Sequence, residues 1–108
     1  MKIDEMVRES AVKPEAKPAI DVPVTVVLRK HLRFDVPAVA TQAAGLSPDC
    51  LIEVKVVSVG GETLIPPPHP FVARIQHHNY NFTIPKLPAQ IMQLKPGDCI
   101  NAYIRRID

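Results

Sequence analysis

Two stretches of the chain alternate strictly between apolar and polar residues. In the first, Ile52, Val54 and Val56 alternate with Glu53 and Lys55. The second stretch follows the same rule, with apolar Ile100, Ala102 and Ile104 between Asn101, Tyr103 and Arg105. A period of two is typical of a strand that buries one face. Both stretches are therefore predicted to be half-buried strands.

The two strands belong to a longer repeat with a period of 48 residues. Residues 24–59 align with residues 72–107 without a gap. The identical pairs are Val24/Val72, Phe34/Phe82, Pro37/Pro85, Gln42/Gln90, Leu46/Leu94, Pro48/Pro96 and Ile52/Ile100. A gapped alternative pairs Asp49-Cys50 with Asp98-Cys99, but it reverses the inside–outside phase of the last strand, so we reject it.

Each unit is predicted to form strand, tight turn, strand, short helix and strand. In the first unit the strands are Val24–Arg29 and Arg33–Val36, around a turn at Lys30–Leu32. Pro37 opens an alanine-rich helix at Ala38–Ala44, and Gly45 is suited to the left-handed residue that ends it. In the second unit, strands at Val72–Gln76 and Tyr80–Ile84 flank a turn at His77–Asn79, and Pro85 and Pro88 lie in the first helical turn.

The remaining segments are interpreted as connectors. Residues 1–23 form an N-terminal arm, with an amphipathic helix expected over 1–13 and extended chain after it. Residues 60–70, with the sequence GGETLIPPPHP, are expected to be a semi-rigid polyproline bridge. Residues 24–108 then make one barrel domain with repeats at 24–59 and 71–108. The fold class is mainly β with two short helices, as tandem ββαβ repeats in a small pseudo-two-fold barrel.

Composition and charge narrow the class of protein. The chain has 108 residues and two cysteines, Cys50 and Cys99, without a CxxC motif. We expect two buried thiols, no disulfide and no metal. No apolar run is long enough to cross a membrane, and no signal peptide is recognised, which gives a cytoplasmic location as the expectation. Residues 71–108 carry five Lys or Arg and two Asp, so much of the positive charge lies there.

One segment resembles a known family. The sequence FTIPKLPAQIMQLKPGD, residues 82–98, is similar to the signature of the AbrB/MazE swapped-hairpin family, and residues 33–54 are a weaker copy. The resemblance implies a small cradle-loop barrel in which two units exchange hairpins, here fused in one chain. It also implies DNA binding through the hairpins. The related double-psi barrel shares the same unit, and the sequence does not separate the two topologies.

The residues give little support for catalysis. The sequence contains no HExxH, no GxSxG and no phosphate-binding glycine loop. His77 and His78 are adjacent, and adjacent residues in a strand point to opposite faces, so they are poor joint ligands for a metal. We predict a protein that is not an enzyme, with no cofactor, no metal and no small-molecule substrate.

The candidate binding residues cluster around the two predicted hairpins. They are Arg29, Lys30, His31, Arg33, Arg74, His77, His78, Asn79, Asn81 and Lys86. Arg and Lys neutralise phosphates, and Arg, Asn and His reach base edges. Tyr80 is open to two interpretations, either stacking on an unpaired base or packing in the core like Leu32, its counterpart.

Three functions remain open on the sequence. The first is an AbrB-like DNA-binding transcription regulator or chromatin protein. The second is an RNA-binding accessory component of a ribonucleoprotein such as the ribosome, which the proline- and lysine-containing arm suits. The third is an antitoxin-like interaction module, whose arm binds a protein partner.

Overall fold

A computed structural model describes residues 20–76 and 78–108 of the chain. The predicted mainly-β class with two short helices is confirmed. The elements in chain order are β1 (Val22–Val27), the 3-10 turn η1 (Lys30–Leu32), β2 (Arg33–Asp35), α1 (Ala38–Ala43), β3 (Leu51–Val59), β4 (Glu62–Thr63), β5 (Phe71–Arg74), β6 (Asn81–Thr83), α2 (Lys86–Met92) and β7 (Cys99–Arg106).

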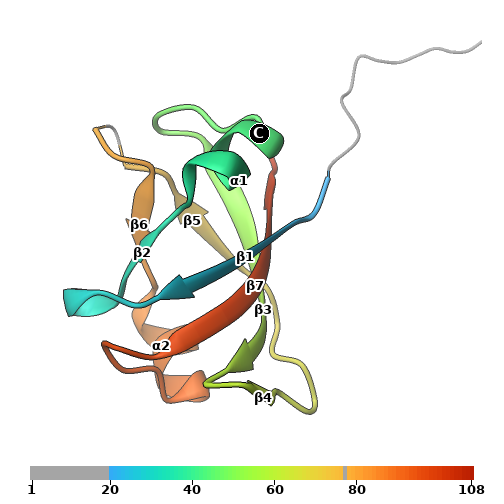
Figure 1. Cartoon of the computed structure of the whole chain (residues 1–108), viewed down its shortest axis with the longest axis vertical. Coiled ribbons are helices and arrows are strands. Elements are labelled where there is room, and N and C mark those ends of the chain that lie inside the picture. Colours follow the sequence, from blue (N-terminus) through green and yellow to red (C-terminus); the bar gives the residue numbers. More distant parts are fainter. Residues whose placement is uncertain (1–19, 77) are drawn as a thin grey trace, which may run out of the picture.

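The two long strands β3 and β7 form the antiparallel centre of the larger sheet. Val54 lies opposite Ile104 in this pair. β1 extends the sheet beyond β7, while β5 and β4 both pair with β3. β2 and β6 form a separate two-stranded sheet, in which Phe34 lies opposite Phe82. Figure 1 shows α1 and α2 at opposite ends of the molecule, with the C-terminus beside α1.

The strands of each predicted hairpin pair with other elements rather than with each other. β1 pairs with β7, β5 pairs with β3, and β2 pairs with β6. Between β1 and β2 only an isolated bridge joins Arg29 to Arg33. His31 and Leu32 have φ angles of 60° and 57°. These two left-handed residues turn the chain sharply, so that β1 and β2 diverge after the bridge.

The predicted alignment of the first strands is wrong by one residue. Val24 is buried, whereas Val72, which lies 48 positions later, is 51% exposed. The N–H of Leu28 donates to Asp98 O at 2.9 Å, and the N–H of Ile75 donates to Cys50 O at 2.9 Å. Ile75, 47 positions after Leu28, is therefore its counterpart. The segment between β5 and β6 is one residue longer than the segment between β1 and β2, which shifts the phase.

The core is built from the inward faces of both sheets. Phe34 and Phe82 stack at its centre, with ring centroids 4.6 Å apart and planes 18° apart. The predicted inside–outside phase of the last strands is confirmed, since Ile52, Val54 and Ile104 are completely buried. The apolar residues at alternate positions of these strands therefore form the packed interior.

The two cysteines differ in environment. Cys50 is buried, and Cys99 is exposed. The expectation of two buried thiols is wrong for Cys99. It lies in β7 opposite Val27, itself 55% exposed, on the outward phase of the sheet. Cys50 instead precedes β3, in a turn that faces the core.

Both helices begin where the prolines predict, and α1 ends one residue before the predicted end at Ala44. α1 follows Pro37 and α2 follows Pro85, which precede the first helical residues. Gly45 takes up a left-handed conformation with φ 65°, as predicted. The turns before β3 and β7 also contain one left-handed residue each, Asp49 with φ 68° and Gly97 with φ 93°. Aspartate at the first of these turns therefore adopts the conformation that glycine supplies at the second.

The connector at 60–70 is only partly as predicted. It opens with a short hairpin, because β4 pairs with the end of β3, where Ser58 lies opposite Thr63. The helix expected over 1–13, and most of the extended arm after it, lie outside the described residues. β1 begins at Val22, two residues before the predicted start of the first strand at Val24.

Candidate nucleic-acid interface

The two predicted hairpin tips lie at opposite ends of the molecule. The segment between β1 and β2 lies against the α2 region, because Gly97 N–H donates to Leu28 O at 2.8 Å and Ile84 N–H donates to Leu32 O at 3.1 Å. The segment between β5 and β6 lies against the α1 region instead. There Val36 N–H donates to Tyr80 O at 2.8 Å. The predicted binding residues therefore do not form one surface.

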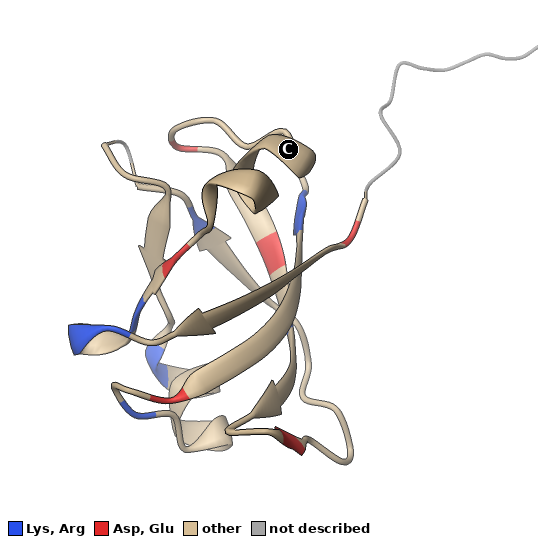
Figure 2. Cartoon of the chain, viewed as in Figure 1, with Lys and Arg blue, Asp and Glu red and all other residues tan. Residues whose placement is uncertain are grey.

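One group of cationic side chains gathers at the end that contains α2. We name this group the basic end, and it consists of Arg29, Lys30, His31, Arg33, Lys86 and Lys95. Figure 2 shows the Lys and Arg positions of η1, the start of α2 and the loop before β7 on the same side of the molecule. All six residues are exposed. Lys95 was not among the predicted site residues.

Asp35 offsets part of this charge. Its carboxylate lies 3.2 Å from Arg29 Nη1 and 3.0 Å from Arg33 Nε. These side chains are 59%, 44% and 42% exposed for Arg29, Arg33 and Asp35, so the ion pairs are weak and easily exchanged. The two arginines remain available to an anion that competes with one carboxylate.

The three lysines of the basic end are not offset in this way. Within residues 20–76 and 78–108, Lys30, Lys86 and Lys95 make no side-chain hydrogen bond or ion pair. Asp98, the acid closest in sequence to Lys95, accepts a hydrogen bond from the Lys95 backbone N–H at 2.8 Å. Three ammonium groups therefore extend into solvent, ready to bind an anion.

The opposite end holds three more of the predicted site residues, Arg74, His78 and Asn79. We name it the α1 end, and it comprises α1, residues 44–50, Arg74, Gln76, residues 78–80 and the end of β7. Arg74 donates to Asp49 O at 2.9 Å from the neighbouring strand, and His78 and Asn79 are exposed on the connection to β6. His77 lies outside the described residues.

Two predictions for this connection change in the structure. Asn81 is only 9% exposed and lies opposite Asp35 in the small sheet, so its assignment to an exposed hairpin surface is wrong. Tyr80 is 39% exposed and is not part of the core, so the interpretation as a core residue is wrong too. The backbone of Tyr80 still matches that of Leu32, because Val36 N–H donates to Tyr80 O as Ile84 N–H donates to Leu32 O.

The C-terminal residues cover the α1 end. Arg106 Nη1 donates to Gly45 O at 2.7 Å, and its Nε lies 3.1 Å from an Asp108 carboxylate oxygen. The other Asp108 oxygen accepts the N–H of Leu51 at 3.1 Å. The Leu51 hydrogen bond, with help from Arg106, lowers the pKa of Asp108. The guanidinium of Arg106 is therefore already bonded to groups of the protein itself.

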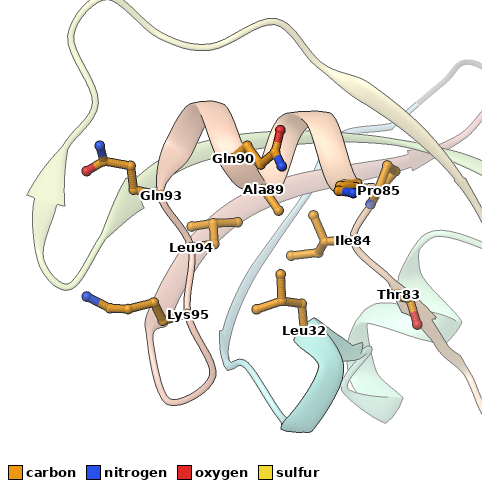
Figure 3. A pocket seen from close by; sticks show the side chains of 10 residues that line it. Leu32, Thr83, Ile84, Pro85, Ala89, Gln90, Gln93, Leu94 and Lys95 are labelled. Carbon is orange, nitrogen blue, oxygen red and sulfur yellow. The ribbon is translucent and has the colours of Figure 1, made fainter.

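A groove lies between η1 and α2 at the basic end. Its volume is about 650 Å³, and its lining consists of Leu32, Thr83, Ile84, Pro85, Lys86, Ala89, Gln90, Gln93, Leu94 and Lys95. Figure 3 shows Leu32, Ile84, Ala89 and Leu94 converging from both walls, with Gln90, Gln93 and Lys95 around them. The groove therefore combines an apolar floor with an amide and ammonium rim.

The corresponding positions at the α1 end carry different side chains. Moving back by 48 positions replaces Lys86 by Ala38 and Lys95 by Ser47. The same step replaces Gln93 by Gly45. No cation at the α1 end matches the lysines around the groove.

Other kinds of site find no support in the part of the chain that the structure describes. No three His, Cys, Asp or Glu side chains there gather into a group that can hold a metal ion. No helix among the same residues is both long and apolar enough to cross a bilayer.

Comparison with known proteins gives information on the fold alone. No family model matches the chain, and no curated protein matches its sequence. The solution structure of PHS018 from Pyrococcus horikoshii is similar, with a TM-score of 0.64 and 21% identity. The match covers 78% of this chain and 88% of that one. The two proteins thus share a small, mainly-β fold.

Proposed function

We propose that this protein is a non-enzymatic nucleic-acid-binding protein and that the basic end binds the phosphates. The observation that carries the proposal is the group of three exposed lysines without partners, Lys30, Lys86 and Lys95, reinforced by Arg29 and Arg33. Such a concentration of cations attracts a polyanion and releases its counterions. The α1 end supplies no equivalent surface.

We propose further that the fold is a fused pseudo-dimer of two ββαβ units with exchanged strands. Matching backbone hydrogen bonds support it: Leu46 N–H donates to Thr41 O, and Leu94 N–H donates to Ala89 O. Phe34 pairs with Phe82, and Lys55 pairs with Tyr103, each exactly one repeat apart. Such self-matching pairs are those expected on a pseudo-two-fold axis.

The exchange of strands explains how the basic end arises. Because β1 pairs with β7, the turn after β1 lies beside the loop before β7. Lys30 of the first unit is thereby placed on the same side as Lys86 and Lys95 of the second. The AbrB/MazE resemblance favours a DNA-binding regulator or chromatin protein, and an RNA-binding role uses the same cations.

The test is the salt dependence of binding. We expect a labelled duplex DNA, a single strand and an RNA hairpin to be bound with affinity that falls as salt rises. The triple variant Lys30→Ala, Lys86→Ala, Lys95→Ala should flatten the log–log slope by about 0.9 units per lost contact on duplex DNA.

A charge-matched control separates this surface from net charge. Lys55→Ala, Arg74→Ala and Arg105→Ala remove the same charge from β3, β5 and β7. The control should keep the wild-type slope, after thermal melting shows that both variants are folded. Unchanged binding by the basic-end variant, or an equal loss in the control, would overturn the proposal.

A further inference from the structure

We infer that the groove between η1 and α2 takes up one unpaired nucleotide, with its base on the apolar floor and its phosphates at Lys86 and Lys95. The inference rests on the proposed function and specifies its ligand as single-stranded nucleic acid. Phosphates alone require only exposed cations, whereas this site places cations around an apolar hollow.

The floor has the character that a base face requires. Ile84, Ala89 and Leu94 are buried core residues whose outer atoms line the groove. A base has two apolar faces and polar edges, and it gains free energy when a face leaves water. The volume of about 650 Å³ accommodates a nucleotide without rearrangement of the core.

The rim has the character that the base edge and backbone require. Gln90 of α2 and Gln93 of the turn after it are among the residues that line the groove, and each offers both an amide donor and an amide acceptor. Lys86 and Lys95 lie at the two ends of the same segment. An acidic peptide would satisfy the lysines, but the paired amides favour a ligand with donors and acceptors on one planar edge.

The backbone of η1 holds the second wall in place. Leu32 has a φ of 57°, and its side chain contributes to the groove opposite α2. A bulky residue in this conformation is uncommon, and strained residues of this kind cluster at functional sites. Its backbone O accepts the Ile84 N–H at 3.1 Å, which fixes the width of the groove.

The geometry also distinguishes single strands from duplexes. A paired base presents only its edge in a groove of the duplex, so it cannot lie on the floor between η1 and α2. An unpaired base can turn out and lay its face there. Duplexes therefore meet only the lysines, and single strands meet the lysines, the floor and the amides.

The experiment compares two sets of ligands with two variants. Gln90→Ala with Gln93→Gly removes both amides, and Gly suits the φ of 55° at position 93. The matched control is Gln42→Ala in α1, which lies 48 residues before Gln90. Position 45, which lies 48 residues before Gln93, is already glycine, so it needs no substitution. Affinities for oligo(dT), oligo(U) and a duplex are measured by fluorescence anisotropy.

We expect the amide variant to bind both oligonucleotides about tenfold more weakly, which corresponds to two hydrogen bonds of ordinary strength. Its affinity for the duplex should be unchanged, and Gln42→Ala should bind every ligand as the wild type does. In NMR spectra, oligo(dT) should shift the side-chain amide resonances of Gln90 and Gln93 but not those of Gln42.

The remaining outcomes overturn the inference, and they show whether the proposed function fails with it. The amide variant could bind oligonucleotides as the wild type does, or lose as much affinity for the duplex as for the single strands. If the lysine variant still loses binding in either case, the groove does not bind a base and the proposed function stands. If wild-type protein binds no nucleic acid, the proposed function fails as well. If an acidic apolar peptide binds and the oligonucleotides do not, the groove is a binding site for a protein partner and the inference is wrong.

Discussion

The basic end and the α1 end have similar backbones and different surfaces. Each contains a short helix opened by proline, a turn with one left-handed residue and the connection between two strands from the other half of the chain. The basic end exposes three lysines that have no partner among the described residues, and two of them, Lys86 and Lys95, line an apolar groove. At the α1 end, Arg106 binds Gly45 O and Asp108.

The difference separates what folds the chain from what sets the charge of its surface. The aromatic pair at the centre of the fold, Phe34 and Phe82, is identical in the two halves and buried. The positions where they differ are exposed, as with Ala38 and Lys86. Substitution at an exposed position seldom affects stability, so one end can carry exposed lysines that the other end lacks.

The largest effect is expected from breaking the element that the two ends share. Phe82→Ala removes one ring of the central stack and should cost about 3–5 kcal/mol of the free energy of unfolding. Phe34→Ala should cost a similar amount. Urea denaturation followed by circular dichroism and by NMR should show both ends unfolding in one transition. A variant in which one end unfolds separately would contradict a shared core.

The next effect comes from giving the α1 end the charges of the basic end. Ala38→Lys with Ser47→Lys should steepen the log–log salt dependence on duplex DNA by up to about 1.8 units, if both lysines reach phosphates. Isothermal titration should also detect a second binding event. Ala38→Glu with Ser47→Glu is the control and should show neither change. Equal behaviour of the two variants would mean that charge at positions 38 and 47 does not affect binding.

A smaller effect is expected from the two left-handed turns. Gly97→Ala places a Cβ at φ 93° with open space around it, so the cost is mainly that of the backbone, about 1 kcal/mol. Asp49→Gly removes the cost of holding a residue with a Cβ at φ 68°, which raises the free energy of unfolding. The greater freedom of glycine in the unfolded chain partly offsets this gain. Thermal melting measures both. A destabilised Asp49→Gly variant would show that the aspartate side chain matters more than its backbone.

The smallest effect concerns the pH dependence of the α1 end. The Leu51 N–H and Arg106 hold the pKa of the Asp108 side chain below its ordinary value. A carboxyl with a lowered pKa in the folded state stabilises above its unfolded pKa, and this contribution is lost as pH falls through the folded pKa. Carbon-detected NMR titration should show Asp108 titrating below an ordinary aspartate, and Arg106→Gln should raise its pKa. An unshifted titration would contradict the hydrogen bonds at this end.

Much of the secondary structure could be predicted because it depends on local pattern. The alternation at Ile52–Val56 gave the buried face of β3, and the prolines gave the starts of both helices. The phase of β5 could not be obtained in this way. One extra residue between Ile75 and Phe82 shifts the strand by one position, and a gap-free alignment hides such a shift.

The candidate site was predicted only in part. Arg29, Lys30, Arg33 and Lys86 are exposed at one end, as the hairpin interpretation requires. Arg74 and His78 belong to the other end, and Asn81 is buried. Lys95 was missed because only the pairing of β1 with β7 places the loop after the second helix beside the first turn.

The sequence by itself determined which residues face inward along the last strands, where the helices start and how much positive charge the chain carries. These properties follow from side-chain period, from the geometry of proline and from counting. The tertiary structure decided which charges meet. Lys30 and Lys95 are far apart in the chain, and only the pairing of β1 with β7 brings their elements together. Because long-range strand pairing is set by the whole core, no local pattern contains it.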